Sequence, residues 1–149
     1  MKKLSLIKSK VDELLKKFLV QDAQIRVIQN EGGIKVDIQS NESAQLIGFE
    51  GRNLEALQTI LGQILASDLK DGEKLVVDVG GYREAQDASF MRKIRSIAQK
   101  VKEYKFPQIL EPMNSYQRRL AHMAASEIEG VVTKSEGEEP NRRIIIEPK

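Results

Sequence analysis

The residues whose spacing best suits chemistry are an arginine and the only histidine of the sequence, Arg118 and His122. They follow Pro112, and the pair Asn114 and Gln117 just before them is typical of a capping box that opens a helix. On a helix, side chains four positions apart share one face. A permanently charged guanidinium beside an imidazole that can donate a hydrogen bond suits the binding of a phosphate.

The same spacing also fits a simpler explanation. Arginine and histidine can meet by chance on a solvated helix face, because pairs four positions apart are common. Met113, Leu120 and Ala124 point to roughly the opposite side of the expected helix. We therefore expect these three residues to face a core, and Arg118 with His122 to face solvent.

The wider stretch resembles the R-three-H domain, a family named for its Arg-x-x-x-His that binds single-stranded nucleic acid. The resemblance rests on the run Pro-Met-Asn-x-Tyr-x-Arg-Arg-x-x-His at 112–122 and on the runs at 131–138 and 142–146. It covers about residues 82–146. It implies that the nucleic acid is contacted by Arg118, Arg119, His122, Arg142 and Arg143.

The composition is that of an ordinary globular protein. Of 149 residues, 40% are hydrophobic and 31% are charged, a balance that does not indicate disorder. No apolar run approaches the roughly 20 residues that cross a bilayer. The absence of cysteine excludes a disulfide scaffold, a thiolate metal site and a thiol nucleophile. We expect a cytoplasmic protein.

The formal net charge of +2 is divided unevenly along the chain. Residues 1–80 carry 11 basic and 12 acidic side chains, whereas residues 81–149 carry 13 basic and 10 acidic ones. The asymmetry is mild compared with that of many nucleic-acid-binding proteins. It nevertheless favours the C-terminal half as the part that meets a polyanion.

The apolar periodicity predicts an α+β fold of two small domains, residues 1–81 and residues 82–149. In each domain we expect helices on one face of a three-stranded sheet. The first domain is expected to contain, in order, a helix at 4–18 with a buried stripe that includes Phe18, strands at 25–27 and 34–38, helices at 43–47 and 54–65, and a strand at 75–79.

The second domain is expected to begin with a long amphipathic helix at 83–105 whose buried stripe includes Tyr104. A crossing at 106–110, interpreted as a short strand, leads to the helix that carries Arg118. Strands at 131–135 and 142–146 complete the sheet.

A Gly-x-x-Gly run at Gly48 to Gly51 joins the two middle helices of the first domain. This order of elements resembles the KH domain, in the bacterial arrangement with an extra helix at the front. The resemblance implies that the loop amides and the apolar groove beside them clamp about four nucleotides of a single strand. It makes Gly48, Phe49, Gly51 and Arg52 a second set of candidate nucleic-acid-binding residues.

Two features of this loop leave its role open. Glycines let the backbone approach a phosphate without a Cβ in the way, but they also suit a tight turn between helices. Glu50 stands where nucleic-acid-binding members of the family commonly have a basic residue. Its carboxylate repels phosphate, and the neighbouring Arg52 offsets that repulsion only in part.

The order KH then R-three-H resembles the Jag family, also called KhpB or EloR, whose proteins are associated with a bacterial membrane insertase. The resemblance implies a cytoplasmic RNA-binding regulator of cell elongation and division. It implies single-stranded RNA as the ligand, with single-stranded DNA as the other candidate. It also implies pairing through the KH domain with a small KH-domain protein or in a homodimer. Members often carry a further N-terminal domain and basic linker that this sequence lacks, so we do not expect association with the insertase.

The rival interpretation is a protein-interaction adaptor whose first domain mediates dimerisation with little RNA binding. Glu50 and the near-neutral charge favour the adaptor, whereas Arg118, His122, Arg142 and Arg143 oppose it. We do not expect an enzyme, because one histidine, no cysteine and no Gly-x-Ser-x-Gly or P-loop leave little for a catalytic centre. We expect no cofactor and no metal, because one histidine without clustered carboxylates is no ligand set.

Overall fold

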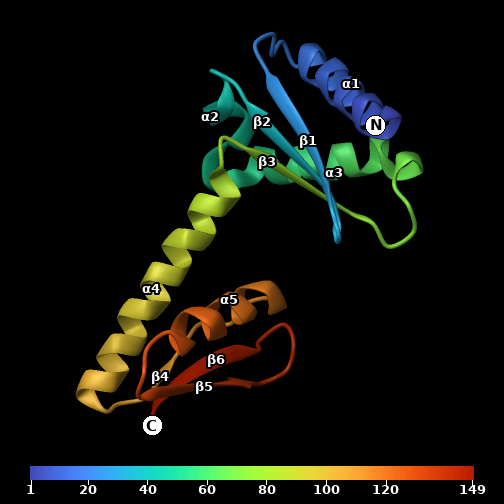
Figure 1. Ribbon diagram of the computed structural model, residues 1–149. Coiled ribbons are helices and arrows are strands. Elements are labelled where there is room, and N and C mark those ends of the chain that lie inside the picture. Colours follow the sequence, from blue (N-terminus) through green and yellow to red (C-terminus); the bar gives the residue numbers. More distant parts are fainter. The chain divides into compact units, whose positions relative to one another are not determined.

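The computed structural model describes residues 1–149 and divides into two compact units, Met1–Arg83 and Glu84–Lys149 (Figure 1). Each unit combines helices with its own three-stranded sheet, so the predicted α+β class is confirmed. None of the helices has both the length and the apolar character needed to cross a membrane.

The first unit holds three α-helices and three strands. Its sheet has the order β1-β2-β3, in which β1 is antiparallel to β2 and β3 is parallel to β2. A parallel pair needs a long crossover, which α2 and α3 supply here. The elements are α1 (Lys2–Lys17), β1 (Gln24–Asn30), β2 (Gly33–Gln39), α2 (Ser43–Ile47), the short 3-10 helix η1 (Phe49–Gly51), α3 (Arg52–Ile64), the short 3-10 helix η2 (Ala66–Asp68) and β3 (Lys74–Val79).

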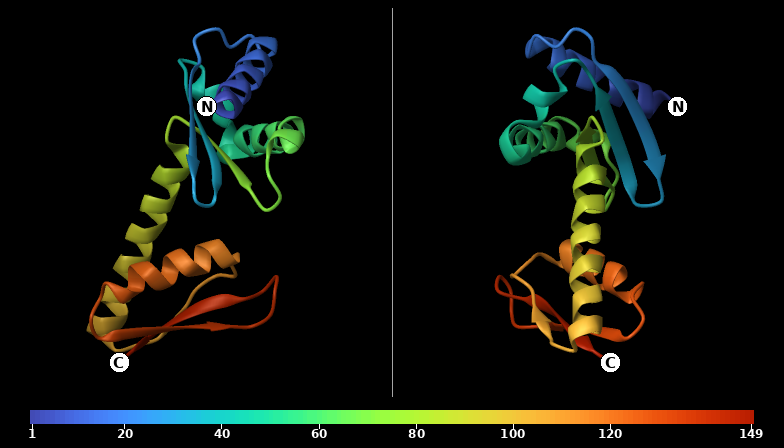
Figure 2. Two further views of the ribbon diagram at one scale, coloured as in Figure 1. Left: turned by 45° about the vertical axis from the view of Figure 1, so that its right-hand side comes forward. Right: turned by 90° about the vertical axis from the view of Figure 1, so that its left-hand side faces the viewer.

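The core of the first unit lies between one face of the sheet and the helices α1 and α3 (Figure 2). Alternate residues of β2, Val36 and Ile38 among them, point to this face and are fully buried. The intervening Lys35 and Asp37 lie on the other face and form an ion pair there. The period of two in the sequence therefore decides which face of the sheet the helices cover.

The second unit packs α4 and α5 on a sheet of order β4-β6-β5, in which both strand pairs are antiparallel. The predicted strand at 106–110 is only two residues long. The last strand, predicted at 142–146, begins one residue later, at Arg143. The elements are α4 (Tyr82–Tyr104), β4 (Gln108–Ile109), α5 (Ser115–Ser126), β5 (Val131–Glu136) and β6 (Arg143–Pro148).

Two aromatic side chains that we predicted to be buried lie at the surface. Phe18 follows the last residue of α1, and Tyr104 is the last residue of α4. Both are exposed. The apolar stripes of these helices were therefore predicted one position too long, because the chain leaves the core where each helix ends.

Glu73 joins three segments of the first unit. Its carboxylate accepts hydrogen bonds from Lys3 Nζ at 2.5 Å, the Lys70 backbone N–H at 2.9 Å and Gln29 Nε2 at 3.1 Å. The hydrogen bond from Lys3, followed by that from the Lys70 backbone, lowers the pKa of Glu73 from its ordinary 4.5. The charged carboxylate thus ties the start of α1 to β1 and to the turn before β3.

We expect Glu73→Gln to lower the free energy of unfolding at neutral pH and to have little effect in acid. Because the pKa is lowered in the folded state, the stabilisation is present above 4.5 and is lost as the pH falls through the lowered value. Urea denaturation between about pH 7 and pH 3 should show the two proteins converging at the acid end. Glu31→Gln, an exposed carboxylate in the β1–β2 turn, is the control. A loss of equal size at every pH would contradict this role of Glu73.

Candidate nucleic-acid interface

The entry of α5 is fixed at two points. The predicted capping box is present, because Asn114 Oδ1 accepts from the Gln117 N–H at 2.9 Å and Gln117 Oε1 accepts from the Asn114 N–H at 3.3 Å. In the first turn, the Tyr116 hydroxyl donates to the Asp87 carboxylate on α4. That hydrogen bond, together with burial, raises the pKa of Tyr116 above its ordinary 10.0.

Arg118 is buried, which contradicts the prediction that it faces solvent. The residue is 9% exposed. Its guanidinium donates from Nη1 to the Met113 carbonyl and from Nη2 to the Glu139 carboxylate, both at 2.5 Å. Glu139 lies in the β5–β6 connection and is mostly exposed. Arg118 therefore ties the entry of α5 to the acidic connection, and it is not a free cation on the surface.

The prediction failed because it gave too little weight to alanine. Ala121 and Ala125 are fully buried. At about 100° per residue they lie between Leu120 and Arg118 around the axis of α5. These small side chains let the helix approach the sheet closely, so that the buried arc extends from Leu120 as far as Arg118.

His122 lies at the margin of this buried arc and is half-buried. Its Nδ1 forms a hydrogen bond of 2.5 Å with Thr133 Oγ1 on β5. Its Nε2 has no partner within the chain and is not buried. Arg118 and His122 thus share a helix face as predicted, but that face lies against the β5–β6 hairpin, with one imidazole nitrogen left accessible.

Three further arginines of the predicted set have no ion pair. Arg119 is exposed, and its guanidinium carbon lies 5.6 Å from the centroid of the Tyr116 ring. Arg142 is exposed, and its Nε donates to Ser135 Oγ at 2.7 Å. Arg143 is half-buried and makes a longer contact, of 3.4 Å, with a backbone carbonyl. All three guanidinium groups lack a carboxylate partner.

Two residues of β5 that sequence reasoning missed bring part of this set together. Thr133 binds His122, and Ser135 binds Arg142. Residues two apart on a strand point to the same face, at a spacing of about 7 Å. β5 therefore places His122 and Arg142 side by side on one face. The sequence of this strand, Val-Val-Thr-Lys-Ser-Glu, does not alternate polar and apolar residues, so it gave no sign of which side chains face α5.

In the first unit, the Gly-x-x-Gly loop is a tight turn between α2 and α3. Gly48 has φ 71° and Gly51 has φ 77°, in the left-handed region that favours glycine. A Cβ on Gly48 would lie 2.6 Å from the Asn53 side chain, and a Cβ on Gly51 would lie 2.9 Å from the Tyr82 ring. Backbone conformation and close packing therefore both require these glycines, whatever the loop binds.

The two inner residues of the loop project from the turn. Phe49 is exposed, and the guanidinium carbon of Arg52 lies 5.5 Å from the centroid of its ring. Glu50 is exposed and adopts a left-handed conformation, with φ 53°. Glu50 has no ion pair with Arg52. The loop thus presents a flat Phe49–Arg52 pair beside an unneutralised carboxylate.

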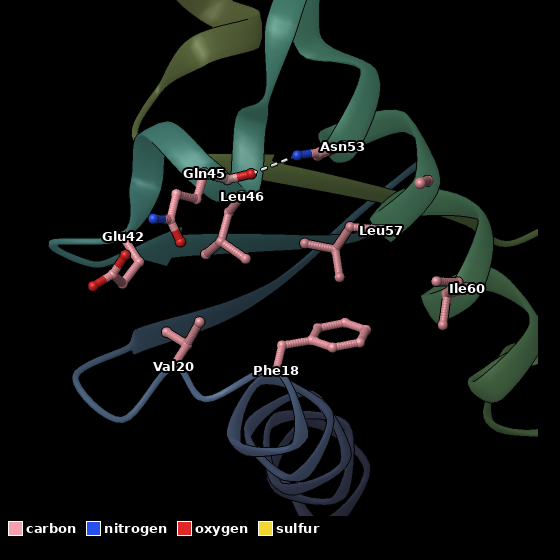
Figure 3. Close-up of a pocket in the computed structure, with 9 residues that line it drawn as sticks. Phe18, Val20, Glu42, Gln45, Leu46, Asn53, Leu57 and Ile60 are labelled. Carbon is pink, nitrogen blue, oxygen red and sulfur yellow. Dashed lines mark hydrogen bonds between the residues drawn. The ribbon is translucent and has the colours of Figure 1, made fainter.

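A pocket of about 380 Å³ lies beside this loop, between the end of α1 and the helices α2 and α3 (Figure 3). Asn53 at its rim donates from Nδ2 to the Gln45 carbonyl at 2.7 Å. Phe18 and Ile60, both partly exposed, form much of its apolar wall. The lining residues are Phe18, Val20, Glu42, Gln45, Leu46, Asn53, Ala56, Leu57 and Ile60.

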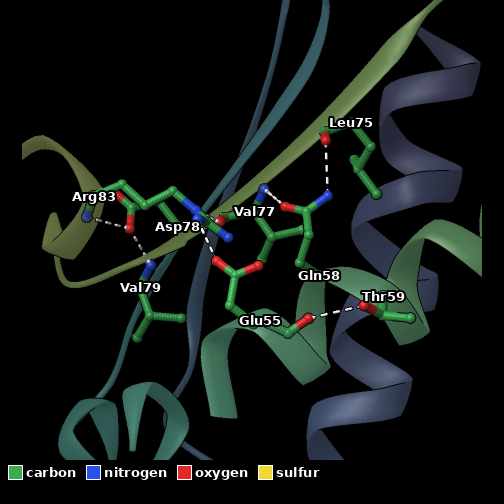
Figure 4. A network of polar contacts seen from close by, with 8 residues as sticks. All are labelled: Glu55, Gln58, Thr59, Leu75, Val77, Asp78, Val79 and Arg83. Carbon is green, nitrogen blue, oxygen red and sulfur yellow. Dashed lines mark hydrogen bonds and ion pairs between the residues drawn. The ribbon is translucent and has the colours of Figure 1, made fainter. Parts of the chain in front are cut away.

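The outer edge of β3 is covered by side chains from α3 and from the start of α4 (Figure 4). Gln58 donates from Nε2 to the Leu75 carbonyl at 2.8 Å and accepts from the Val77 N–H at 2.7 Å. Arg83 donates from Nε to the Val77 carbonyl at 2.8 Å and pairs with Glu55 at 2.7 Å. The Leu75 carbonyl and both backbone groups of Val77 are therefore already satisfied and cannot pair with another strand.

Comparison with known proteins gives a domain match and several relatives. Residues 90–148 match the R-three-H domain. The chain is 34% identical over 125 residues to the RNA-binding protein KhpB of Clostridium symbiosum. The aligned stretch covers 84% of this chain and 56% of that protein. It is 28% identical over 118 residues to RNA-binding protein KhpB of Streptococcus pneumoniae, covering 79% of this chain and 36% of that protein.

A third relative, RNA-binding protein KhpB of Lactiplantibacillus plantarum, is 30% identical over 111 residues, which is 74% of this chain and 34% of that protein. The chain therefore spans about half the length of the first relative and about a third of the other two. The aligned stretches are longer than the second unit alone, so they include part of the first unit.

We expect Arg118→Met to lower the free energy of unfolding by about 1–3 kcal/mol, because the half-buried Met113 carbonyl loses its donor and Glu139 loses its partner. Chemical denaturation measures the change. Arg119→Met, an exposed arginine on the same helix, is the matched control and should change stability by less than about 0.5 kcal/mol. Equal effects of the two substitutions would show that Arg118 has no structural role.

Proposed function

The chain belongs to the KhpB family and carries an R-three-H domain, and from this membership we propose that it binds single-stranded RNA. The match of residues 90–148 to the R-three-H domain carries the proposal. The relatives that align with 74–84% of the chain are named RNA-binding proteins, which supports it further.

The second unit supplies the phosphate contacts in this proposal. Arg119 and Arg142 are exposed and have no carboxylate partner, so each is free to pair with a phosphate oxygen. His122 presents its Nε2 beside Arg142 on the same face of β5. Arg143 adds charge at the start of β6. Arg118 contributes by positioning, since its guanidinium is already used by Met113 and Glu139.

The first unit has the order of elements of a KH domain, and we assign it that role within the proposal. A Gly-x-x-Gly turn between two helices and a parallel β2–β3 pair support the assignment. Gly48 and Gly51 shape the turn, and Phe49 with Arg52 offers one ring and one cation to a strand. The uncompensated Glu50 makes this loop the weaker contact. Pairing with a small KH-domain protein or a second copy would also use this unit.

Family membership also supports a cytoplasmic location of the protein and a role in controlling bacterial cell elongation and division. Both extend the proposal beyond the RNA contact itself. The absence of cysteine is compatible with a reducing compartment. The test of the proposal is nonetheless the contact with RNA, because the remaining roles depend on it.

We expect the affinity for labelled single-stranded RNA to fall linearly on a logarithmic plot against salt concentration, by about 0.7 per phosphate contact. Arg119→Gln and Arg142→Gln should each flatten that slope by about 0.7 and weaken binding alike for all sequences. Fluorescence anisotropy between about 50 and 300 mM salt gives the slopes. Arg26→Gln, an exposed arginine on β1, is the matched control.

The same series separates the proposal from the adaptor. If the folded chain binds neither RNA nor DNA strands at the lowest salt concentration, the proposed RNA binding is wrong and the adaptor is favoured. A parallel series with DNA strands of the same sequence shows whether the 2′-hydroxyl matters, since that group alone distinguishes the two ligands at a given site.

Glu50→Lys should strengthen binding at low salt, because it exchanges repulsion for attraction beside the Gly-x-x-Gly turn. The gain should be about 5- to 30-fold, the range for an exposed and screened charge reversal near one phosphate. The control is Glu31→Lys, which changes the net charge by the same amount. Glu31 is exposed in the β1–β2 turn, far from Glu50 in the sequence. If both reversals give the same gain, the effect is one of net charge. No gain from Glu50→Lys would exclude this loop as a nucleic-acid site.

A further inference from the structure

The C-terminal end of α4 carries two exposed aromatic rings that the core of the second unit does not use. Tyr104, the last residue of α4, is 71% exposed, and Phe106 is 69% exposed. Neither belongs to the apolar core of that unit. Exposed apolar side chains gathered in this way mark an interaction site.

The backbone fixes the turn between the two rings. Lys105 adopts a left-handed conformation with φ 55°, and its N–H donates to the Val101 carbonyl at 2.9 Å. This arrangement ends α4 and turns the chain at once into Phe106. Tyr104 and Phe106 are therefore held on either side of a defined turn.

A hollow of about 240 Å³ lies between these rings and the last turns of α4. It is smaller than the roughly 300–1,000 Å³ of pockets that enclose drug-sized ligands. A helix or a folded loop would need a longer groove than this hollow, whereas the hollow has room for a single planar ring system. The lining residues are Ile97, Lys100, Val101, Tyr104, Phe106 and Gln108.

The charge around the hollow is positive. Lys100, Lys102 and Lys105 are exposed on the last turn of α4 and just beyond it, against the single carboxylate of Glu103. None of these four residues has an ion pair. The lysines offset the negative end of the α4 dipole, which would otherwise repel a phosphate. Aromatic rings beside unpaired cations are the combination that binds single strands, through stacked bases and paired phosphates.

We propose that Tyr104 and Phe106 form a base-stacking subsite for single-stranded nucleic acid, in which Lys100 and Lys105 contact the adjoining phosphates. The inference rests on the proposed function and adds a contact to it that lies outside the Arg-x-x-x-His helix. Stacking tolerates every base, because each base has a planar face. The subsite therefore adds affinity without sequence preference.

The test compares full-length variants on two strands, a ten-nucleotide oligouridine and the same strand with abasic sites. Tyr104→Ala and Phe106→Ala should each weaken binding to oligouridine by about fivefold or more, the lower range for one stacked base. They should leave binding to the abasic strand unchanged. Tyr104→Phe keeps the ring and should bind as the wild type does. Val132→Ala, a partly exposed apolar residue on β5, is the control.

Crosslinking of the wild-type protein to strands that carry 5-bromouridine gives a readout that needs no variant. Mass spectrometry should find crosslinks at Tyr104 or Phe106, and crosslinks confined to other residues would overturn the subsite even if an alanine variant fails to fold. If the wild type binds but both alanine variants bind oligouridine equally well, the subsite is wrong and the proposed function stands. If the wild type binds neither strand, both fail. Altered self-association of the variants in sedimentation, with RNA binding unchanged, would assign the hollow to a contact between copies of the chain.

Discussion

The close approach of α5 to the β5–β6 hairpin is the constraint on which the second unit depends. Ala121, Ala124 and Ala125 are fully buried on the side of the helix that meets the sheet. Their size brings Arg118 within reach of Glu139, 21 positions later, and His122 within reach of Thr133, 11 positions later. A larger side chain at any of the three positions would force the helix outward and break both contacts, because closely packed cores do not absorb added volume.

This packing divides the basic residues of the second unit into two groups. Arg118 is used within the structure, where it holds the entry of α5 and the acidic connection together. Arg119 and Arg142 keep their charges at the surface. His122 belongs to both groups, since one ring nitrogen binds β5 and the other remains accessible. The spacing of Arg118 and His122 suggests two ligands for one phosphate. In the structure, Arg118 positions the helix, and only His122 has a nitrogen free for such a contact.

In the first unit, too, residues that could bind a partner are already used within the structure. Its Gly-x-x-Gly turn is required by backbone conformation and by packing against Asn53 and Tyr82. Gln58 and Arg83 cover part of the open edge of β3, where they bind the Leu75 carbonyl and both backbone groups of Val77. An uncovered edge would invite pairing with another chain. The Phe49–Arg52 pair remains accessible, as does the apolar pocket that Phe18 helps to line.

Local physics let the sequence by itself determine the α+β class, the order of the elements and the capping box at Asn114. Periods of 3.6 and 2, glycines and caps act over a few residues and need no knowledge of the rest of the chain. The Gly-x-x-Gly turn and the Arg-x-x-x-His helix were visible for the same reason. Only the tertiary structure decided that Arg118 is buried, that Tyr104 and Phe18 are exposed and that β5 joins His122 to Arg142. These facts depend on how closely a helix lies on a sheet and on where it leaves the core. Partners distant in the chain set both, and no local pattern encodes them.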